Sequence, residues 1–434
     1  MNDSSDPYLG RRGRQWWLVL ALMLAATVAV IDRSILSLLV DPIKSELGFS
    51  DTQMGLIFGL AFAIANVLFT LPAGYLADRI SRRGIIAAGC VAWSVATSVC
   101  GLALGFLQLL LARASVGFAE GVIHPCSFSM LRGALATERR GRGFATYGIA
   151  IMFGSALGFL LGGAILQFYA TGIADHWPLI GGLTPWRQVL MTLGILGLPF
   201  ALLMLTVREP LRQRAITERA EGVQAALVHM RRYWRIYVPL LAYSGFVSMK
   251  ANAYGAFLAS IPQRRFAVPA AEVGRNLGLL MLLAAPLGIW LMGVAMDRLT
   301  RRYGVRGPVM VAIVTAALGF LFSSSAPIAP TVGWFYLFTA CDFFVGGGGV
   351  AITAAIIASI TPAFNMGKTT AIQLFVYGII GMGAGPAITG LVSDAIFMQH
   401  GGIAPALSAC CAVFTLAATI CAVIVLRTIR HYRE

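Results

Sequence analysis

The chain has 434 residues, of which 58% are apolar and only 12% are charged, and its formal net charge is +15. A soluble domain is about 45–50% apolar and about 25% charged, so this composition excludes an ordinary soluble fold and indicates a protein dissolved in a lipid bilayer. The positive charge lies in short segments between apolar runs, so we expect no nucleic-acid partner.

Twelve apolar runs are long enough to cross a bilayer, because about 20 apolar residues span its hydrocarbon core. In chain order the runs are 16–40, 54–76, 84–105, 107–130, 143–169, 186–207, 236–262, 275–296, 308–325, 333–358, 368–396 and 401–427. All should be helices, because isolated strands cannot satisfy their backbone in lipid. The sequence therefore predicts an all-α polytopic membrane protein, whose first run is a retained span and not a signal peptide.

One long polar stretch separates the runs into two sets of six. The predicted organisation is a cytoplasmic tail at 1–15, a six-helix bundle at 16–207, a cytoplasmic linker at 208–235, a second six-helix bundle at 236–427 and a tail at 428–434. The linker is either a helix along the membrane face or a solvated connection. Lys and Arg fall mostly in the loops on the side of both termini, which predicts that both termini are cytoplasmic.

A charged motif, G-x-x-x-D-R-x-x-R-R, follows the second run and recurs about half a chain length later, after the eighth. Its residues are Gly74, Asp78, Arg79, Arg82 and Arg83, and then Gly293, Asp297, Arg298, Arg301 and Arg302. Such a duplication predicts two related halves. The aspartates can cap helix N-termini of the other half, the arginines can hold the halves together, and the glycines allow close helix contact. Topology anchoring alone would also explain the arginines.

This motif resembles the cytoplasmic loop of the major facilitator superfamily. The resemblance implies two pseudo-symmetric six-helix bundles and secondary transport by alternating access. It also implies that the ten motif residues form a cytoplasmic gate, which stabilises closure on that side of the membrane.

Six charged residues lie well away from the ends of the predicted spans, where each costs roughly 2.5–3.5 kcal/mol on insertion scales and usually serves function. They are Asp32 and Arg33 in the first run, Arg113 and Glu120 in the fourth, Lys250 in the seventh and Asp342 in the tenth.

The fourth run places Arg113, Glu120 and His124 on one helical face, which must therefore line a cavity or a protein contact. Asp32 lies at a depth similar to that of Arg113, so these two can pair, or Arg33 can instead reach Glu120. Desolvation raises the pKa of a carboxyl group and a neighbouring arginine lowers it, so an exchange of partners would move a proton. Glu120 is the first candidate for the proton carrier, Asp32 is the second and His124 is a candidate relay. Static ion pairs remain the alternative.

Within the superfamily, the chain resembles the spinster-type transporters. The resemblance is carried by Asp32-Arg33, by Ser50-Asp51-Thr52-Gln53-x-Gly55-Leu56 before the second run, and by Arg113 with Glu120. It implies a lipid-like substrate, such as a lysophospholipid or a sphingoid phosphate. It also implies proton coupling through the carboxylates of the first and fourth spans.

Polar and aromatic residues in the second half form a candidate substrate cavity. They are Tyr243, Lys250 and Tyr254 in the seventh run, Asp342 in the tenth, and Gln373 and Tyr377 in the eleventh. A cationic patch with aromatic walls suits an amphipathic anion. An interhelical hydrogen bond would explain any one of them taken alone.

Other classes of function lack their signatures. There is no G-x-x-x-x-G-K-S/T loop for ATP, no H-E-x-x-H and no G-x-S-x-G, and the seven cysteines lie in apolar runs without metal spacing. We expect no enzyme activity, no metal and no cofactor, although a receptor or a membrane-embedded enzyme is the competing class.

The sequence predicts a proton-coupled transporter of a bacterial-type inner membrane, monomeric, whose partners are protons, the lipid bilayer and a lipid-like or organic-anion substrate. The alternatives within the superfamily are a drug or organic-anion exchanger and an uptake symporter.

Overall fold

The computed structural model describes Tyr8 and residues 11–178, 180–211, 223–346 and 348–429. Within these residues every regular element is a helix, which confirms the predicted all-α class. Eleven helical segments of this described part are long and apolar enough to cross a membrane. The remaining predicted span corresponds to α11 (Trp234–Phe257), whose Ser244, Ser248, Lys250 and Asn252 lower its hydropathy. The tails and linker residues 212–222 lie largely outside the described residues.

Contacts divide the chain into two compact units. Unit 1 comprises Met1–Phe49, Ala61–Ile216 and Pro269–Gly278, and unit 2 comprises Ser50–Leu60, Thr217–Val268 and Leu279–Glu434. The predicted domain boundaries follow the order of the spans instead, and they remain a prediction.

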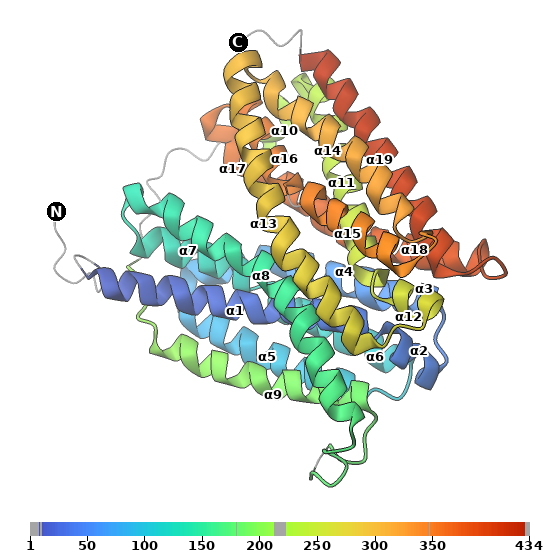
Figure 1. Cartoon of the computed structure of the whole chain (residues 1–434). Helices are drawn as coiled ribbons and strands as arrows, with labels where there is room; N and C mark the ends of the chain where they lie inside the picture. The colour runs from blue at the N-terminus through green and yellow to red at the C-terminus, as the bar shows by residue number, and fades with distance from the viewer. Residues whose placement is uncertain (1–7, 9–10, 179, 212–222, 347, 430–434) are drawn as a thin grey trace. The chain divides into compact units, whose positions relative to one another are not determined.

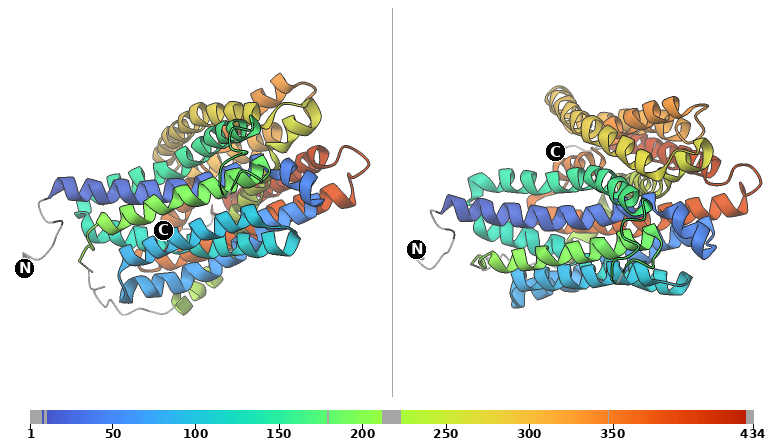
Figure 2. Two further views of the ribbon diagram at one scale, coloured as in Figure 1. Left: turned by 90° about the horizontal axis from the view of Figure 1, so that it is seen from below. Right: turned by 60° about the horizontal axis from the view of Figure 1, so that its bottom comes forward.

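Unit 1 is built from long helices that pack side by side. Its helices are α1 (Arg12–Leu38), α2 (Val40–Leu47), α4 (Phe62–Arg79), α5 (Arg82–Leu102), α6 (Phe106–Glu120), α7 (Ile123–Ala134), α8 (Thr137–Ala170) and α9 (Pro185–Thr206). α1 lies along α8, and α5 lies along α9 (Figures 1 and 2). Their shared core includes Leu18, Leu22, Met130 and Tyr147.

Unit 2 contains more and shorter helices. They are α3 (Asp51–Gly55), α10 (Val223–Arg232), α11, α12 (Ser260–Phe266), most of α13 (Ala270–Tyr303), α14 (Arg306–Ser325), α15 (Val332–Gly346), α16 (Gly349–Ile360), α17 (Ala363–Val376), α18 (Gly385–Ala395) and α19 (Ile403–Thr428). Both α11 and α14 pack against α19, around a core that includes Tyr237, Leu240, Val309 and Ala418.

Several of the predicted spans are not continuous α-helices. The fourth span ends its first helix at Glu120 and resumes at Ile123, and the tenth ends its first helix at Gly346 and resumes at Gly349. π-helical segments, Leu56–Ala61 and Tyr377–Ala384, interrupt the second and eleventh spans. Irregular backbone at membrane depth is tolerated where protein or a cavity surrounds it, so these breaks identify the candidate site.

Large apolar side chains are exposed along the helices of both units. Leu68, Leu202, Leu283 and Trp290 are each more than half exposed. Contiguous apolar surface of this extent is rare on soluble monomers. Lipid is the solvent that would cover it, which agrees with an integral membrane protein.

Two glycines on α13 provide a matched test of the packing in unit 2. A Cβ added at Gly288 would overlap the backbone carbonyl of Phe344, whereas a Cβ at Gly293 would meet no described atom within 4 Å. We expect Gly288→Ala to destabilise the protein by about 1–3 kcal/mol through overpacking. Gly293→Ala should instead stabilise the helix by about 0.5–1 kcal/mol. Thermal unfolding in detergent measures both, and shifts of equal sign would refute this packing.

Candidate functional site

The most deeply buried ion pair joins α1 to α6 inside unit 1. Arg113 Nη1 donates to Asp32 Oδ2 at 2.6 Å, and Thr97 Oγ1 of α5 donates to Asp32 Oδ1 at 3.3 Å. The side chain of Asp32 is 0% exposed and that of Arg113 is 1% exposed. Removing one partner from such a pair strands a charge in a low-dielectric interior. Asp32 is therefore held by two donors in a place that water does not reach.

A second pair lies beside it and is held more loosely. Arg33 Nη2 is 3.2 Å from Glu120 Oε2, and the exposed fractions of the two side chains are 31% and 3%. Neither carboxylate oxygen of Glu120 has a hydrogen-bond partner among the described residues, although both oxygens are buried. Phe62 lies close to both arginines, with its ring centroid 5.1 Å from Arg33 Cζ and 5.5 Å from Arg113 Cζ. Glu120 is thus a buried carboxylate whose ionic partner among the described residues, Arg33, is partly exposed.

The third predicted residue on this face has a different hydrogen-bond partner. His124 Nδ1 lies 2.8 Å from the hydroxyl of Tyr147 on α8. The His124 ring also stacks against Phe128, with 6.4 Å between the ring centroids. His124 is the second residue of α7, which begins after the break at Glu120. Its role as a proton relay remains a prediction.

The predicted cavity residues of the second half converge on α11. Lys250 Nζ donates to Asp342 Oδ1 of α15 at 2.5 Å, and the hydroxyls of Tyr254 and Thr339 lie 3.1 Å apart. Gln373 Nε2 donates to Ser244 Oγ at 2.8 Å, and Ser248 Oγ donates to the backbone carbonyl of Tyr377 at 2.9 Å. Tyr243 is buried on the same helix. The lysine charge is therefore already neutralised by Asp342.

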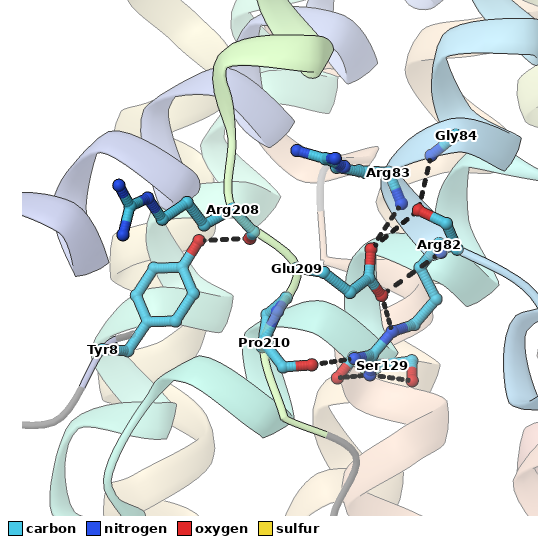
Figure 3. Close-up of polar contacts among 9 residues, drawn as sticks. Tyr8, Arg82, Arg83, Gly84, Ser129, Arg208, Glu209 and Pro210 are labelled. Atoms are coloured by element: carbon cyan, nitrogen blue, oxygen red, sulfur yellow. Dashed lines mark hydrogen bonds and ion pairs between the residues drawn. The ribbon is translucent and has the colours of Figure 1, made fainter. Parts of the chain in front are cut away.

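The first copy of the charged motif is bound to a carboxylate that the sequence did not single out. Arg82 Nε donates to Glu209 Oε1 at 2.6 Å, and the backbone N–H groups of Arg82 and Arg83 donate to the two Glu209 oxygens at 3.2 and 3.1 Å (Figure 3). Arg82 also donates to Ser129 Oγ at 3.1 Å and to the carbonyl of Pro210. Glu209 thus caps the N-terminus of α5 from just beyond the end of α9.

These contacts all lie within unit 1, so they do not test the predicted role of the motif in joining the two halves. Arg79 packs over the Tyr75 ring, with its Cζ 4.1 Å from the ring centroid. In the second copy, Asp297 and the three arginines Arg298, Arg301 and Arg302 are exposed near the end of α13. The side chain of Asp78 lies outside what the structure describes. A gate across the halves remains a prediction.

The two motif glycines differ from expectation. A Cβ at Gly74, as at Gly293, would meet no described atom within 4 Å. The expected close helix contact is therefore absent at both positions. The close approaches occur at other glycines, among them Gly117, whose added Cβ would meet the backbone of Phe62.

Two further polar clusters lie near the ends of the spans that are opposite to the charged motif. In unit 1, Glu46 accepts hydrogen bonds from Thr184 Oγ1, Trp186 Nε1 and Arg187 Nε at 2.6, 2.6 and 2.8 Å. In unit 2, Arg264 donates to both oxygens of Asp51 at 3.0 and 3.2 Å. Neither partner could be predicted from the sequence, because each pair joins segments far apart in the chain.

Glu209 should make the stability of unit 1 sensitive to acid. Burial raises the pKa of Glu209, but hydrogen bonds from Arg82 and Arg83 outweigh burial and hold that pKa below its ordinary value. A carboxylate with a lowered pKa adds stability above its unfolded-state pKa and loses it as pH falls through the folded-state pKa. We expect Glu209→Gln to be less stable than wild type at neutral pH and to approach it on acidification. Melting temperatures of the two proteins, measured from neutral to acidic pH, test this prediction. A difference between the two melting temperatures that does not change with pH would contradict it.

The chain is similar to a known protein family and to several known proteins. The family model described as Major Facilitator Superfamily matches residues 22–386. An "MFS-type efflux pump" of Mycolicibacterium smegmatis is 25% identical, with 91% of this chain and 87% of that protein covered. "Protein spinster" of Drosophila melanogaster is 24% identical, with 89% of this chain and 63% of that protein covered. The solved structure of a bacterial homologue of the human lysosomal transporter Spinster, inward-facing and unoccupied, aligns with a TM-score of 0.78 and 23% identity over 96% of both chains.

Proposed function

Because the chain belongs to the Major Facilitator Superfamily, and is therefore a secondary transporter, we propose that it couples protons to the movement of an amphipathic anion. The proposed substrate is lipid-like, of the lysophospholipid or sphingoid phosphate class, and it moves by alternating access between the two halves. In this proposal the protein acts as a monomer in a bacterial-type inner membrane, with both termini in the cytoplasm.

The observation that carries the proposal is the state of Glu120. It is a buried carboxylate at a helix break, it has no hydrogen-bond partner among the described groups, and its ionic partner Arg33 is partly exposed. An incompletely satisfied charge in a low-dielectric site is the one that neutralises most readily. Asp32 is held by Arg113 and Thr97, so it is the less mobile carboxylate of the two.

The four charges of this network also link the proton to an anion. Asp32, Arg33, Arg113 and Glu120 carry two negative and two positive charges, so the network is neutral when Glu120 is ionised. A proton on Glu120 leaves one net positive charge and frees Arg33. A buried net charge is costly, so an anionic group of the substrate would be drawn to Arg33. Proton and anion would then bind together, and each would strengthen the binding of the other.

Support for a lipid-like substrate comes from the similarity to spinster proteins. The alternative is a drug or organic-anion exchanger or an uptake symporter of the same superfamily, which the similarity to an efflux pump favours. The polar network suits any of these, because it recognises an anionic group and not the apolar tail.

The substrate class is tested by transport in liposomes that contain the purified protein and carry an imposed pH gradient. The probes are radiolabelled lysophosphatidate, a sphingoid phosphate, glucuronate and a cationic dye. We expect the gradient to drive net movement of the lysophosphatidate or the sphingoid phosphate. Movement of glucuronate alone would replace the lipid-like substrate by a sugar acid, and movement of the dye alone would overturn the anionic class.

A further inference from the structure

Among the described residues, each half carries an ion pair between its first and fourth spans in which both side chains are buried. In unit 1 the pair is Asp32 of α1 with Arg113 of α6, and in unit 2 it is Lys250 of α11 with Asp342 of α15. The polarity is reversed, because the first span supplies the acid in unit 1 and the base in unit 2. Both members of the second pair are buried, so the pair is not a surface contact.

A cavity adjoins the second pair. It has a volume of about 50 Å³ and is lined by Lys250, Tyr243, Thr315, Gly346 and Thr415, among others, from α11, α14, α15 and α19. A single water molecule needs only about 10–15 Å³ and a few polar partners. The ammonium group and the hydroxyls supply those partners, so a few water molecules fit beside Lys250. No cavity of this kind is needed to explain a purely structural ion pair.

From this geometry we infer that Lys250 and Asp342 form a second proton-binding site, which exchanges protons with water in the adjoining cavity. The inference rests on the proposed function as a proton-coupled transporter, and it adds a site in unit 2, whereas the Glu120 network lies in unit 1. A hydronium ion that enters the water of the cavity gives its proton to a carboxylate oxygen of Asp342 and becomes a neutral water molecule. Lys250 remains an ammonium, and no other bond is formed or broken.

The chemistry of the two partners explains why this pair should exchange a proton more readily than Asp32 and Arg113. Guanidinium is a fixed fork that stays charged, whereas the lysine ammonium is a compact group on a flexible stem, able to turn toward water. The Tyr254 ring, whose centroid is 5.5 Å from Lys250 Nζ, would stabilise the ammonium while Asp342 is neutral.

The surroundings of the pair hold few competing groups. α11 contributes the phenols of Tyr243 and Tyr254, and α19 contributes the thiol of Cys411, which interacts electrostatically with both Lys250 and Asp342. α14 contributes Thr315 and carries no charged residue between Gly307 and Ser325, and α16 carries none at all. Asp342 is therefore the carboxylate that a proton would reach from this cavity.

Infrared difference spectroscopy of the full-length protein in lipid nanodiscs tests the inference without any substrate. A protonated carboxyl group has a C=O stretching band that a carboxylate lacks, so we expect such a band to appear on acidification and to be missing in Asp342→Asn. In Lys250→Met the same band should be larger than in wild type at equal pH, because the ammonium that favours the carboxylate is gone. The Glu120→Gln variant should keep the band of Asp342 and lack the band of the Glu120 carboxyl group.

The double variant Lys250→Met/Asp342→Asn removes the pair without leaving a charge, so it serves as the folded reference if a single variant is unstable. Its difference spectrum against wild type should show the Asp342 band. Identical spectra for wild type and the double variant across the acid-to-neutral range would overturn the inference and leave a static ion pair. Because no transport is measured, this result is independent of the test of the proposed function.

Discussion

Arg113→Met is expected to destabilise the protein by about 3–5 kcal/mol, because it leaves the Asp32 carboxylate buried without its ionic partner. Asp32 has no exposed surface, and the hydroxyl of Thr97 is the one other donor that the structure shows for it. The loss is comparable to about half of the total stability of a typical domain. Thermal unfolding followed by tryptophan fluorescence in one detergent measures it.

Two variants control this prediction. Asp32→Asn/Arg113→Met removes both charges, and it should recover much of the lost stability, since replacing a whole buried pair is often close to neutral. Arg33→Met removes the neighbouring arginine. The side chain of Arg33 is 31% exposed, so its loss should destabilise the protein less than the loss of Arg113. Equal losses for Arg113→Met and Arg33→Met would show that burial of the first pair is not the cause.

Glu120→Gln is expected to abolish substrate accumulation driven by a pH gradient while exchange of substrate across the membrane continues. Glutamine keeps the shape of the side chain, but it neither binds nor releases a proton at working pH. If one proton moves with one substrate, wild type should accumulate substrate about tenfold for each pH unit, since 1.4 kcal/mol corresponds to a factor of ten. The variant should reach equal concentrations on both sides.

Glu46→Gln is the matched control, because Glu46 is also a glutamate of unit 1 paired with an arginine. Its partners Thr184, Trp186 and Arg187 lie around the N-terminus of α9, away from the break at Glu120. We expect Glu46→Gln to retain accumulation. A loss of accumulation in Glu46→Gln but not in Glu120→Gln would remove Glu120 from the coupling mechanism.

The helical class and the approximate spans could be predicted because apolar length is a local property of the sequence. The breaks after Glu120 and Gly346 could not, since a glycine within an apolar run is compatible with both a continuous and an interrupted helix. α11 shows the converse case. Its polar residues lower its hydropathy, yet the same residues bind α15 and α17 and make it the centre of the polar contacts in unit 2.

The pairing of buried charges was only partly predictable. Depth along the spans limited the partners of Arg113 and Arg33, and the structure pairs Arg113 with Asp32 and Arg33 with Glu120. Glu209 was missed because it lies in a polar segment without periodicity, where a carboxylate that caps α5 looks like any solvated residue. The feature that points to Glu209 is Arg82. A buried arginine needs a carboxylate partner, and this one comes from another segment.

The central claim is that a proton moves with the substrate through the Glu120 network. The most direct measurement is the internal pH of liposomes that contain the protein and a pH-sensitive dye, after a substrate gradient is imposed without a pH gradient. The account predicts a change of internal pH that depends on the substrate, appears with wild type and disappears with Glu120→Gln. Substrate movement by wild type at constant internal pH would contradict it.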